Sequence, residues 1–372
     1  MSKKKIVLFG TGSVAESFYR QFKNEVEILF CVDNTEKQNR TFHNLKILPP
    51  LKKNLTDYFV VVASSFYYEI RKQLIQLGLK EFVDFTYNGC IKKKIAILHG
   101  NCHIEVIREY LMKSCEFSKE YEIYPSVPIC NLKEDNFDDS ILENCDLFIH
   151  QDIQINNPFS IKFSDNYTLK RLKKNCITII IPNLFGLGQG FFPQTVRNPR
   201  NKMYNGDPSG MFPDGDENII RLMEQNLSIN EIVNILTTKD VYNSDKVIDN
   251  FNYYIEKIRR REENWDIKIL DDILKKYRLE KLFYDIGHPT NSILEEISKG
   301  ILRKLDIFDD EKIILDSCLE MHEVPIYPGV CESLGLQFNE NIIRKKSIKK
   351  LRDVKMNFEE YIREYIEWCY TE

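Results

Sequence analysis

The sequence predicts an α/β protein with a small N-terminal parallel-sheet domain and a larger α/β domain whose C-terminal portion is helical. Two observations predict this class. Short apolar runs alternate with segments of helical periodicity between residues 5 and 305, a pattern typical of strands joined by crossover helices. From residue 216 onward, segments of helical periodicity dominate.

Residues 1–90 are predicted to form the small parallel-sheet domain. Strands are expected at 5–9, 27–32 and 58–63, with one helix ending near residue 22 and another at 67–77. The first strand leads into Gly10-Thr11-Gly12-Ser13-Val14-Ala15, and Asp33 ends the second. A G-x-G-x-x-A turn with an acid about twenty residues later resembles the dinucleotide-binding fingerprint. Gly10, Gly12 and Asp33 are therefore candidate ligand contacts; the alternative is a domain of this fold that holds no ligand.

A second domain is predicted over residues 95–310, after a short linker at 90–94. Its strands are expected at 95–98, 146–151 and 176–181. Residues 186–215 are rich in Gly, Pro and Asn and predict a long loop. Loops of this length usually have a function, which indicates substrate binding. Two helices are predicted within 216–236, a continuous helical segment over 242–278 and a helix at 292–305. Residues 311–372 are expected to be a helical extension that packs on the second domain.

The composition excludes several classes of protein. With 372 residues, of which 43% are apolar and 29% charged, the chain is long enough for two or more folded domains. A formal net charge of −4 provides no overall attraction to nucleic acid. No apolar run approaches the ~20 residues needed to span a bilayer. The ten cysteines show no C-x-x-C spacing, so no metal site is predicted. We expect a cytoplasmic protein with no transmembrane segment.

A candidate catalytic site is indicated most directly by the stretch His99-Gly100-Asn101-Cys102. It follows the apolar run 95–98 and precedes a segment of helical periodicity at 104–111, which predicts a strand, a tight turn and a helix. Cys102 would then lie at the positive end of a helix dipole, an environment that favours a thiolate nucleophile. Backbone N–H groups at the same helix end are suited to holding an oxyanion.

Asp285-Ile286-Gly287-His288-Pro289-Thr290 supplies the groups that a cysteine nucleophile would need. The D-x-x-H spacing lets the carboxylate of Asp285 reach one imidazole nitrogen of His288, which leaves the other nitrogen for a nucleophile. Pro289 fits the first turn of the next helix, so we expect His288 near the N-cap of that helix. Cysteine, histidine and aspartate together predict nucleophilic acyl transfer. The alternatives are a small residue filling a turn at Cys102 and structural capping roles for His288 and Asp285.

Four segments of the first 90 residues resemble the Rossmann-like modules attached to bacterial glycan-modifying enzymes. They are Phe9-Gly10-Thr11-Gly12, Cys31-Val32-Asp33-Asn34, Leu45-Lys46-Ile47-Leu48-Pro49-Pro50 and Val60-Val61-Val62-Ala63-Ser64. In some of those proteins the module binds a nucleotide-sugar and carries out no redox chemistry. The resemblance implies substrate handling, so NAD is not expected as a cofactor.

The order of the motifs from residue 95 onward resembles that of SGNH or GDSL-type hydrolases. In that fold a nucleophile follows the first strand and a D-x-x-H motif comes late in the domain. Here Gly100-Asn101-Cys102 and Asp285-Ile286-Gly287-His288 occupy these places. Cysteine replaces the serine of that fold, and its Gly-x-Asn block is missing, with Gln151 or a nearby asparagine as the substitute. These departures argue against hydrolysis.

A closer resemblance, to the WcbI-type polysaccharide biosynthesis family, covers most of residues 95–340. The matching pieces are Gly100-Asn101-Cys102-His103, 146–151, Phe191-Phe192-Pro193-Gln194, His288-Pro289-Thr290, Pro325-Ile326-Tyr327-Pro328-Gly329 and Leu334-Gly335-Leu336. Membership of that family implies capsule polysaccharide biosynthesis, binding of coenzyme A (CoA) and acetylation of a sugar hydroxyl. Position 103 commonly carries Gln in that family, so His103 is a candidate for altered ligand contacts.

The resemblance implies a set of site residues. Cys102, His288 and Asp285 would be catalytic, with Asn101 and Gln151 as oxyanion contacts. CoA contacts would come from Gly100 and His103, and the cations for its phosphates from Arg108 or from Arg197, Arg200 and Lys202. The alternative for the last three is a solvated surface.

The sequence therefore predicts an acyl-CoA-dependent O-acetyltransferase that modifies a sugar of a capsular or other surface polysaccharide. Acetyl-CoA would be the co-substrate, and a sugar or nucleotide-sugar the acceptor. We expect the protein at the periphery of a glycan-assembly complex, and homo-oligomers remain open. The first alternative is a GDSL-like carbohydrate esterase or deacetylase. The second is a non-catalytic CoA- or nucleotide-binding protein in glycan assembly, and an NAD-dependent oxidoreductase is third.

Overall fold

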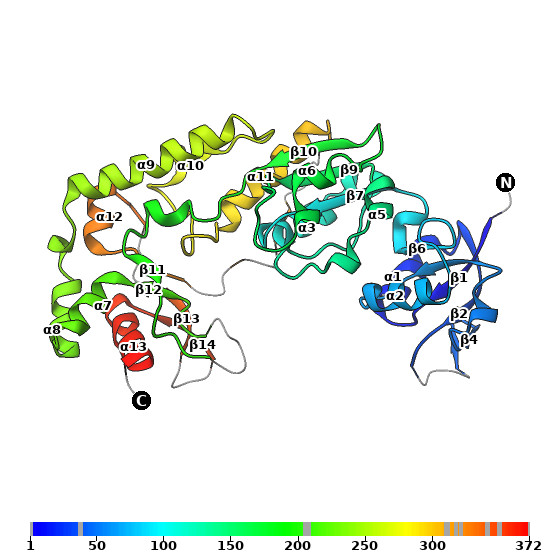
Figure 1. The fold of residues 1–372 in the computed structure, drawn as a ribbon, viewed down its shortest axis with the longest axis horizontal. Coiled ribbons are helices and arrows are strands. Elements are labelled where there is room, and N and C mark those ends of the chain that lie inside the picture. Colours follow the sequence, from blue (N-terminus) through cyan, green and yellow to red (C-terminus); the bar gives the residue numbers. More distant parts are fainter. Residues whose placement is uncertain are drawn as a thin grey trace. The chain divides into compact units, whose positions relative to one another are not determined.

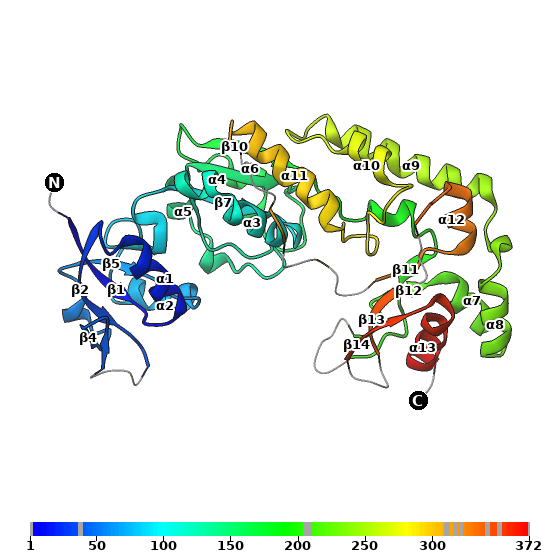
Figure 2. The ribbon, with the colours of Figure 1, turned by 180° about the vertical axis from the view of Figure 1, so that it is seen from behind.

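The computed structural model describes residues 3–35, 40–203, 210–308, 313–315, 319, 323–338, 343–347 and 352–370. The chain divides into two compact units (Figures 1 and 2). Unit 1 contains Met1–Ile104 and Met112–Ile179, and unit 2 contains Glu105–Leu111 and Ile180–Glu372. Parallel-sheet portions and many helices give the mixed α/β structure that the sequence predicts. The narrower Rossmann-like and SGNH-like classes and the three domain boundaries stay predictions.

The first sheet of unit 1 contains six strands in the order β3-β4-β2-β1-β5-β6. Their bounds are β1 (Lys4–Phe9), β2 (Val26–Val32), β3 (Thr41–Phe42), β4 (Leu45–Leu48), β5 (Phe59–Val62) and β6 (Phe85–Tyr87). The short β3 pairs antiparallel with β4, and the other neighbours pair parallel. The three strands predicted in the first 90 residues are β1, β2 and β5.

Helices α1 (Ser13–Phe22) and α2 (Tyr67–Gln76) cover opposite faces of this sheet. Successive side chains of a strand point to opposite faces. Ile6 and Leu8 of β1 belong to the apolar cluster that contains the buried residues of α1, and Val7 and Phe9 belong to the cluster that contains those of α2. Because both faces are covered, the central strands are apolar almost throughout.

The second sheet of unit 1 has the order β10-β9-β7-β8, and β7 runs parallel to β8 and β9. Its strands are β7 (Lys94–His99), β8 (Tyr121–Ile123), β9 (Leu147–Gln151) and β10 (Ile177–Ile181), the last of which spans the division between the units. The helices of this region are α3 (His103–Lys113), α4 (Cys115–Glu120), α5 (Asp139–Glu143) and α6 (Asp165–Thr168). Short 3₁₀ turns lie at 52–54, 88–91, 134–136 and 161–163. The two sheets share one apolar cluster, in which Val60 and Phe85 join Ile97 and Phe148.

A buried ion pair also links the two sheet regions of unit 1. The Nε of Arg71 on α2 lies 2.6 Å from Oε2 of Glu81, and both side chains are almost fully buried. The guanidinium also donates to Asp138, which precedes α5. Tyr67 and Tyr124 donate to the other oxygen of Glu81. Arg71 and Glu81 both belong to the first sheet region, and their bonds to Asp138 and Tyr124 connect this buried pair to the second.

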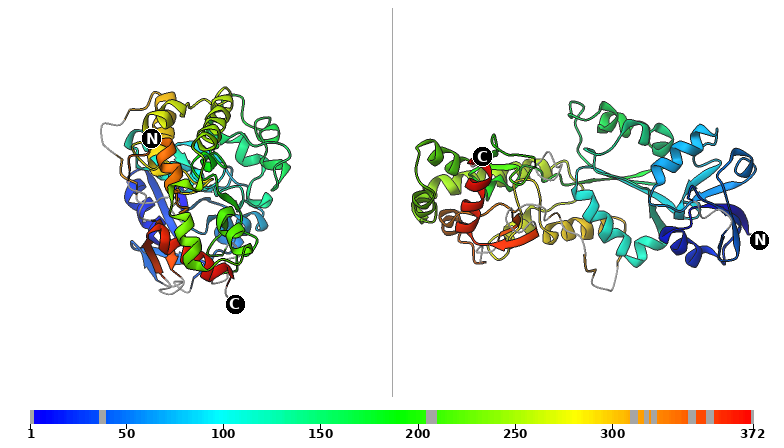
Figure 3. Two further views of the ribbon diagram at one scale, coloured as in Figure 1. Left: turned by 90° about the vertical axis from the view of Figure 1, so that its left-hand side faces the viewer. Right: turned by 90° about the horizontal axis from the view of Figure 1, so that it is seen from below.

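Unit 2 is mainly helical. Its helices are α7 (Glu217–Glu224), α8 (Ile229–Leu236), α9 (Ser244–Glu262), α10 (Leu270–Lys276), α11 (Asn291–Lys304), α12 (Pro328–Leu334) and α13 (Phe358–Tyr370), with 3₁₀ turns at 188–190 and 239–241. Two antiparallel strand pairs accompany them, β11 (Thr195–Arg197) with β12 (Asp214–Asp216) and β13 (Ile343–Ser347) with β14 (Arg352–Met356). Helix α12 packs against α9 (Figure 2), and α13, red in Figure 3, packs against α8. No helix within the described ranges is long and apolar enough to cross a membrane.

Two secondary-structure expectations in unit 2 are wrong. The helical pattern of 242–278 breaks between α9 and α10, because Asp266 leaves the helical path and pairs with the backbone of Ile180. The segment 311–372 contains α12 and α13 but also the hairpin β13–β14. In that hairpin Ile343 pairs with Met356, a contact between distant residues that local periodicity does not report. Ser228 and Glu231 form a capping box at the start of α8.

Asp216 connects two parts of unit 2. Its Oδ1 accepts the backbone N–H groups of Asn218 and Ile219 and so caps α7, while the hydroxyl of Tyr327 donates to its carboxylate at 2.9–3.0 Å. Burial raises the pKa of Asp216 to about 6, against the opposing effect of these donors. The protonated form is therefore favoured in the folded protein more than in the unfolded chain.

We expect this carboxyl to make stability fall as the pH rises. The unfolded pKa is about 3.9 and the folded pKa about 6, so the stabilisation from proton binding is complete below the first value and lost as the pH rises through the second. Asp216→Asn keeps an N-cap and an acceptor for Tyr327 without the charge. Chemical denaturation between pH 4 and pH 7 should give the variant a flatter profile of unfolding free energy than the wild type. Profiles that run parallel, as expected for the exposed control Asp240→Asn, would contradict this.

Candidate functional site

Gly100, Asn101 and Cys102 form the turn between β7 and α3, as the sequence predicts. A Cβ on Gly100 would lie only 2.7 Å from Oε1 of Gln151, the last residue of β9, and 3.0 Å from a methyl group of Ile104. A larger residue would therefore push the turn away from the neighbouring strand. The lack of a side chain at Gly100 is explained by this packing.

The side chain of Gln151 holds the turn in place. Its Oε1 accepts the backbone N–H of Asn101 at 2.8 Å, and its Nε2 lies 3.3 Å from Nδ1 of His103. The side-chain oxygen of Asn101 in turn accepts the backbone N–H of His103 at 3.0 Å, at the first residue of α3. Gln151 and His103 are almost completely buried. These contacts give Gln151, Asn101 and His103 a role in positioning Cys102.

Cys102 itself is half-buried and belongs to no disulfide. It immediately precedes α3, a helix of 11 residues, so its side chain stands at the positive end of the helix dipole. The supporting residues come from the carboxyl ends of two parallel strands, β7 and β9. Ligands of open α/β sheets bind at this end.

Asp285 and His288 lie close together in unit 2. Nδ1 of His288 is 2.6 Å from Oδ2 of Asp285, and Oδ1 of Asp285 accepts the backbone N–H groups of Gly287 and His288 at 2.7 and 2.8 Å. Burial alone would raise the pKa of Asp285, but the hydrogen bond and charge of His288 and the two N–H groups lower it below its usual value. Asp285 is 5% exposed and the His288 side chain 33%. The carboxylate is therefore ionised and fixes one ring nitrogen, while part of the imidazole remains accessible.

The expectation that Pro289 lies in the first turn of the helix is wrong, whereas His288 lies near the N-cap, as expected. Helix α11 begins at Asn291, so His288 and Pro289 precede it. The pair lies instead on a tight turn closed by the N–H of Tyr284, which donates to the carbonyl of His288, and by a β-bridge between Phe283 and Pro289. The capping position belongs to Thr290, because the bridge keeps the preceding residues extended.

Two distant segments brace the turn. The N–H of Gly188 donates to the carbonyl of Ile286, and a Cβ on Gly188 would lie 2.4 Å from the carbonyl oxygen of Asp285. The N–H of Val324 donates to the carbonyl of Tyr284. The Gln194 amide also donates to the carbonyl of Pro325, so two motifs singled out in the sequence, around residues 191–194 and 325–329, form scaffold in the neighbourhood of the His288 turn.

Phe185 lies beside this turn and has no counterpart among the predicted site residues. Its ring edge would be 2.8 Å from a Cβ on Gly287, so the ring covers the glycine between Asp285 and His288. The side chain is nevertheless 59% exposed. The sequence shows only a phenylalanine shortly after β10, with no motif around it. Single exposed apolar residues of this kind are common on protein surfaces.

The predicted cations are placed on several elements. Arg197 ends β11 and is exposed, Arg200 stacks over the ring of Tyr370 at 4.5 Å, and Lys202 is exposed. Arg108 lies on α3, and its Nε is buried without a hydrogen-bond partner in the described part of the chain. A buried guanidinium donor without an acceptor fits an anionic ligand. Among described residues, no group of three or more His, Cys, Asp or Glu is arranged to hold a metal ion.

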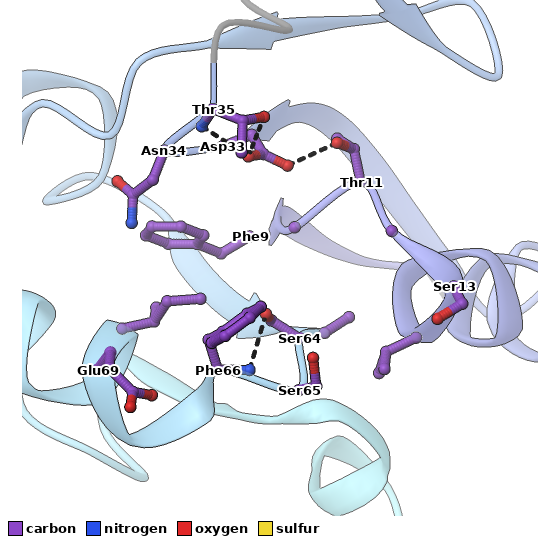
Figure 4. A pocket seen from close by; sticks show the side chains of 15 residues that line it. Phe9, Thr11, Ser13, Asp33, Asn34, Thr35, Ser64, Ser65, Phe66 and Glu69 are labelled. Atoms are coloured by element: carbon purple, nitrogen blue, oxygen red, sulfur yellow. Dashed lines mark hydrogen bonds between the residues drawn. The ribbon is translucent and has the colours of Figure 1, made fainter. Parts of the chain in front are cut away.

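The structure brings Gly10, Gly12 and Asp33 together in a cavity of about 400 Å³ in unit 1 (Figure 4). Asp33 joins two loops, since its carboxylate accepts the hydroxyl of Thr11 at 2.5 Å and the hydroxyl and backbone N–H of Thr35 at 2.8 and 2.9 Å. Phe66 and Glu69 also line the cavity. The sequence identified the glycines and the acid, whereas these other residues carry no motif.

Comparisons with known proteins agree with these observations. A family model described as polysaccharide biosynthesis enzyme WcbI matches residues 95–310. A second, described as C2185-like, N-terminal, matches residues 2–82. No curated protein matches the chain at the required significance.

A solved structure described as WcbI, a novel polysaccharide biosynthesis enzyme, is similar in fold. The TM-score is 0.61 at 16% sequence identity, over 76% of this chain and 91% of the other. That structure is described as native protein without a disulfide bond between CoA and one of its cysteines. At this identity the likeness concerns the fold, whereas the family model covers more than half of the sequence. The chain therefore belongs to the family of the polysaccharide biosynthesis enzyme WcbI.

Proposed function

We propose that the protein is an acyl-CoA-dependent O-acetyltransferase that modifies a sugar of a capsular or other surface polysaccharide. The observation that carries the proposal is the Asp285–His288 pair, in which a buried ionised carboxylate holds one ring nitrogen of a partly exposed histidine. This is the arrangement of a general base in acyl transfer. The WcbI family and the mention of CoA in the related structure support the choice of reaction class.

Cys102 is proposed as the nucleophile. Acetyl-CoA supplies an acetyl group activated as a thioester. A bond from Sγ of Cys102 to the acetyl carbon forms as the bond to the sulfur of CoA breaks, and the thiol proton of Cys102 passes to the leaving CoA sulfur. His288 then takes the proton from a sugar hydroxyl, whose oxygen attacks the acetyl carbon, and Cys102 leaves as a thiolate that recovers the proton. A thioester exchanged for another thioester changes little in energy, which suits a transferase.

The developing oxyanion needs hydrogen-bond donors at the same turn. We propose the backbone N–H of Cys102 and the side-chain NH₂ of Asn101 for this role. The side-chain oxygen of Asn101 is held by the N–H of His103, which orients the amide. Gln151 acts on the site by fixing the backbone of Asn101, so it is a positioning residue.

Arg108 is the best supported cation for a phosphate of CoA. Its Nε is buried and has no acceptor among the described residues, and charge-assisted hydrogen bonds from arginine to phosphate are strong and directional. Arg197, Arg200 and Lys202 remain candidates for the other phosphates. Arg200 already stacks on Tyr370, which leaves its guanidinium edge for an anion. Residues 1–90 are proposed to position the acceptor sugar.

Acetylation of Cys102 is the first prediction of this proposal. Intact-protein mass spectrometry after incubation with acetyl-CoA should show a single acetyl adduct, which disappears in Cys102→Ala and persists in Cys115→Ala, a variant of an exposed cysteine. An unmodified protein that still transfers acetyl groups would indicate direct attack by the sugar hydroxyl with His288 as base. Cleavage of simple esters without CoA would favour the esterase, and full glycan modification by Cys102→Ala and His288→Ala would favour a binding protein.

Asp285→Asn should change the orientation and tautomer of His288 without disturbing the fold of the turn. The asparagine oxygen can keep the backbone N–H groups of Gly287 and His288, but its NH₂ would face Nδ1 and impose the wrong tautomer. We expect kcat for CoA release in the presence of a sugar acceptor to fall on the order of 10²–10⁴-fold, with little change in CoA affinity. Asp271→Asn, an exposed acid on α10, is the control. An unchanged kcat in Asp285→Asn would show that the Asp285–His288 pair does not act in catalysis.

Arg108→Gln should weaken CoA binding. The loss of one charge-assisted hydrogen bond corresponds to roughly 10–100-fold in Kd, measured by calorimetry on the full chain. Comparison with dephospho-CoA shows which phosphate is involved, because its affinity should be unaffected by the substitution if Arg108 contacts the 3′-phosphate. Equal CoA affinity in the variant and the wild type would assign the phosphates to other cations.

A further inference from the structure

Two cysteines of unit 1 meet where neighbouring strands begin. Cys145 lies two residues before β9, and Cys176 directly precedes β10. The carbonyl of Asp146 accepts the backbone N–H of Ile177 at 2.9 Å, which holds the two strand starts together. The thiols of Cys145 and Cys176 are hydrogen-bonded to each other, and both are free cysteines. The acetyl-transfer proposal uses neither of them.

The two thiols differ in exposure. Cys145 is completely buried, and its Sγ lies 3.2 Å from the carbonyl oxygen of Leu147. Cys176 is half-buried, and its Sγ lies 3.5 Å from the carbonyl oxygen of Ile177. A small reagent from the solvent therefore meets the sulfur of Cys176 before that of Cys145.

The surroundings favour a thiolate at the more exposed sulfur. The hydrogen bond from Cys145 lowers the pKa of Cys176, and burial opposes this effect. The charge of Lys173 and the N–H of Phe148 lower this pKa further, whereas the charge of Asp146 raises it. Burial raises the pKa of Cys145 well above its usual value, so this thiol keeps its proton. A partly accessible thiolate next to a second thiol is the arrangement of redox-sensing cysteine pairs.

We propose that Cys145 and Cys176 form a reversible disulfide when the protein meets a hydroperoxide. The thiolate of Cys176 attacks one peroxide oxygen, so that an S–O bond forms, the O–O bond breaks, and the other oxygen leaves and takes a proton from water. The thiol of Cys145 then attacks the sulfur of Cys176. The S–S bond forms as the S–O bond breaks, and the oxygen leaves as water with the proton of the Cys145 thiol. The peroxide is reduced and the two thiols are oxidised, and a dithiol reductant reverses the reaction.

The segment between the two cysteines contacts the strands that carry the candidate site. Nε2 of His99 lies 2.7 Å from the carbonyl oxygen of Phe163, and Nδ1 of His150 lies 3.1 Å from Oδ1 of Asp165. Both histidines lie near the carboxyl ends of their strands, β7 and β9. A disulfide between the two cysteines closes a loop of roughly 30 residues, which restricts the unfolded chain. Oxidation therefore fastens a segment that packs against these strand ends.

Peptide mapping of the full chain tests the proposal. After treatment with hydrogen peroxide and alkylation of the remaining thiols, trypsin should release residues 134–162 joined to residues 175–197, and each of these peptides contains one cysteine. The joined pair should disappear after reduction with dithiothreitol and should persist in Cys115→Ser, a variant of an exposed cysteine. Recovery of the two peptides unlinked, or linked to other cysteines, would overturn the proposal.

Single substitutions distinguish the roles of the two sulfurs. Cys145→Ser removes the second thiol, so peroxide should leave a sulfenic acid on Cys176, trapped by dimedone on residues 175–197. Cys176→Ser, at the half-buried position, should prevent the link and leave Cys145 unmodified. A dimedone adduct on Cys145 instead of Cys176 would refute the assigned order of attack.

Thermal unfolding measures the effect of the link. Peroxide should raise the melting temperature of the wild type above that of Cys145→Ser treated in the same way, by at least about 2 °C. Equal changes in both proteins would contradict a clamp between the strand starts. These measurements need neither CoA nor a sugar, so their failure is distinguishable from failure of the acetyl-transfer proposal.

Discussion

The close approach of a strand end to its neighbour is the constraint on which both sheet sites depend. Gly10 lies against the carbonyl of Ala63, and Gly100 lies against the amide of Gln151, in each case at a distance that excludes a Cβ. The glycine lets the chain turn directly from the central strand into a helix. The residues that follow, Gly12 in one sheet and Cys102 in the other, are thereby placed at a helix N-terminus. Residues 1–179 thus use the same local solution twice, once around a cavity and once around a thiol.

The strand–turn–helix units and the D-x-x-H contact were predictable because they are encoded locally. Apolar runs of four to six residues followed by glycine specify β1, β7 and the helices after them. The contact between Asp285 and His288 needs only a turn of three residues. In contrast, the break between α9 and α10 depends on Ile180, a partner far away in the chain, and the hairpin β13–β14 depends on cross-strand pairs such as Ile343 with Met356. Local periodicity contains no information about such partners, and both were mispredicted.

The contacts around the predicted site residues could be learned only from the structure. Gln151 was predicted as an oxyanion contact, and in the structure its Oε1 accepts the backbone N–H of Asn101 while its Nε2 lies 3.3 Å from Nδ1 of His103. The sequence predicts that Gln151 lies at the end of a strand, but it does not predict which group its side chain contacts. His288 was expected near a helix N-cap and lies there, but the hydrogen bonds that Gly188 and Val324 donate to its turn were not predicted. Phe185 escaped detection because an exposed phenylalanine has no pattern of its own. A side chain's neighbours thus decide whether it reacts, positions or packs.

The two candidate sites differ in the charged groups that surround them. CoA carries a phosphate monoester and needs cations, which the chain offers on α3 and in the segment around β11. The cavity beside Gly12 offers helix N–H groups, hydroxyls and two carboxylates. Among the lining residues that the structure describes, the charged side chains are the carboxylates of Asp33 and Glu69. An anionic ligand is therefore better matched by the buried Nε of Arg108, which has no acceptor among the described residues, than by this cavity.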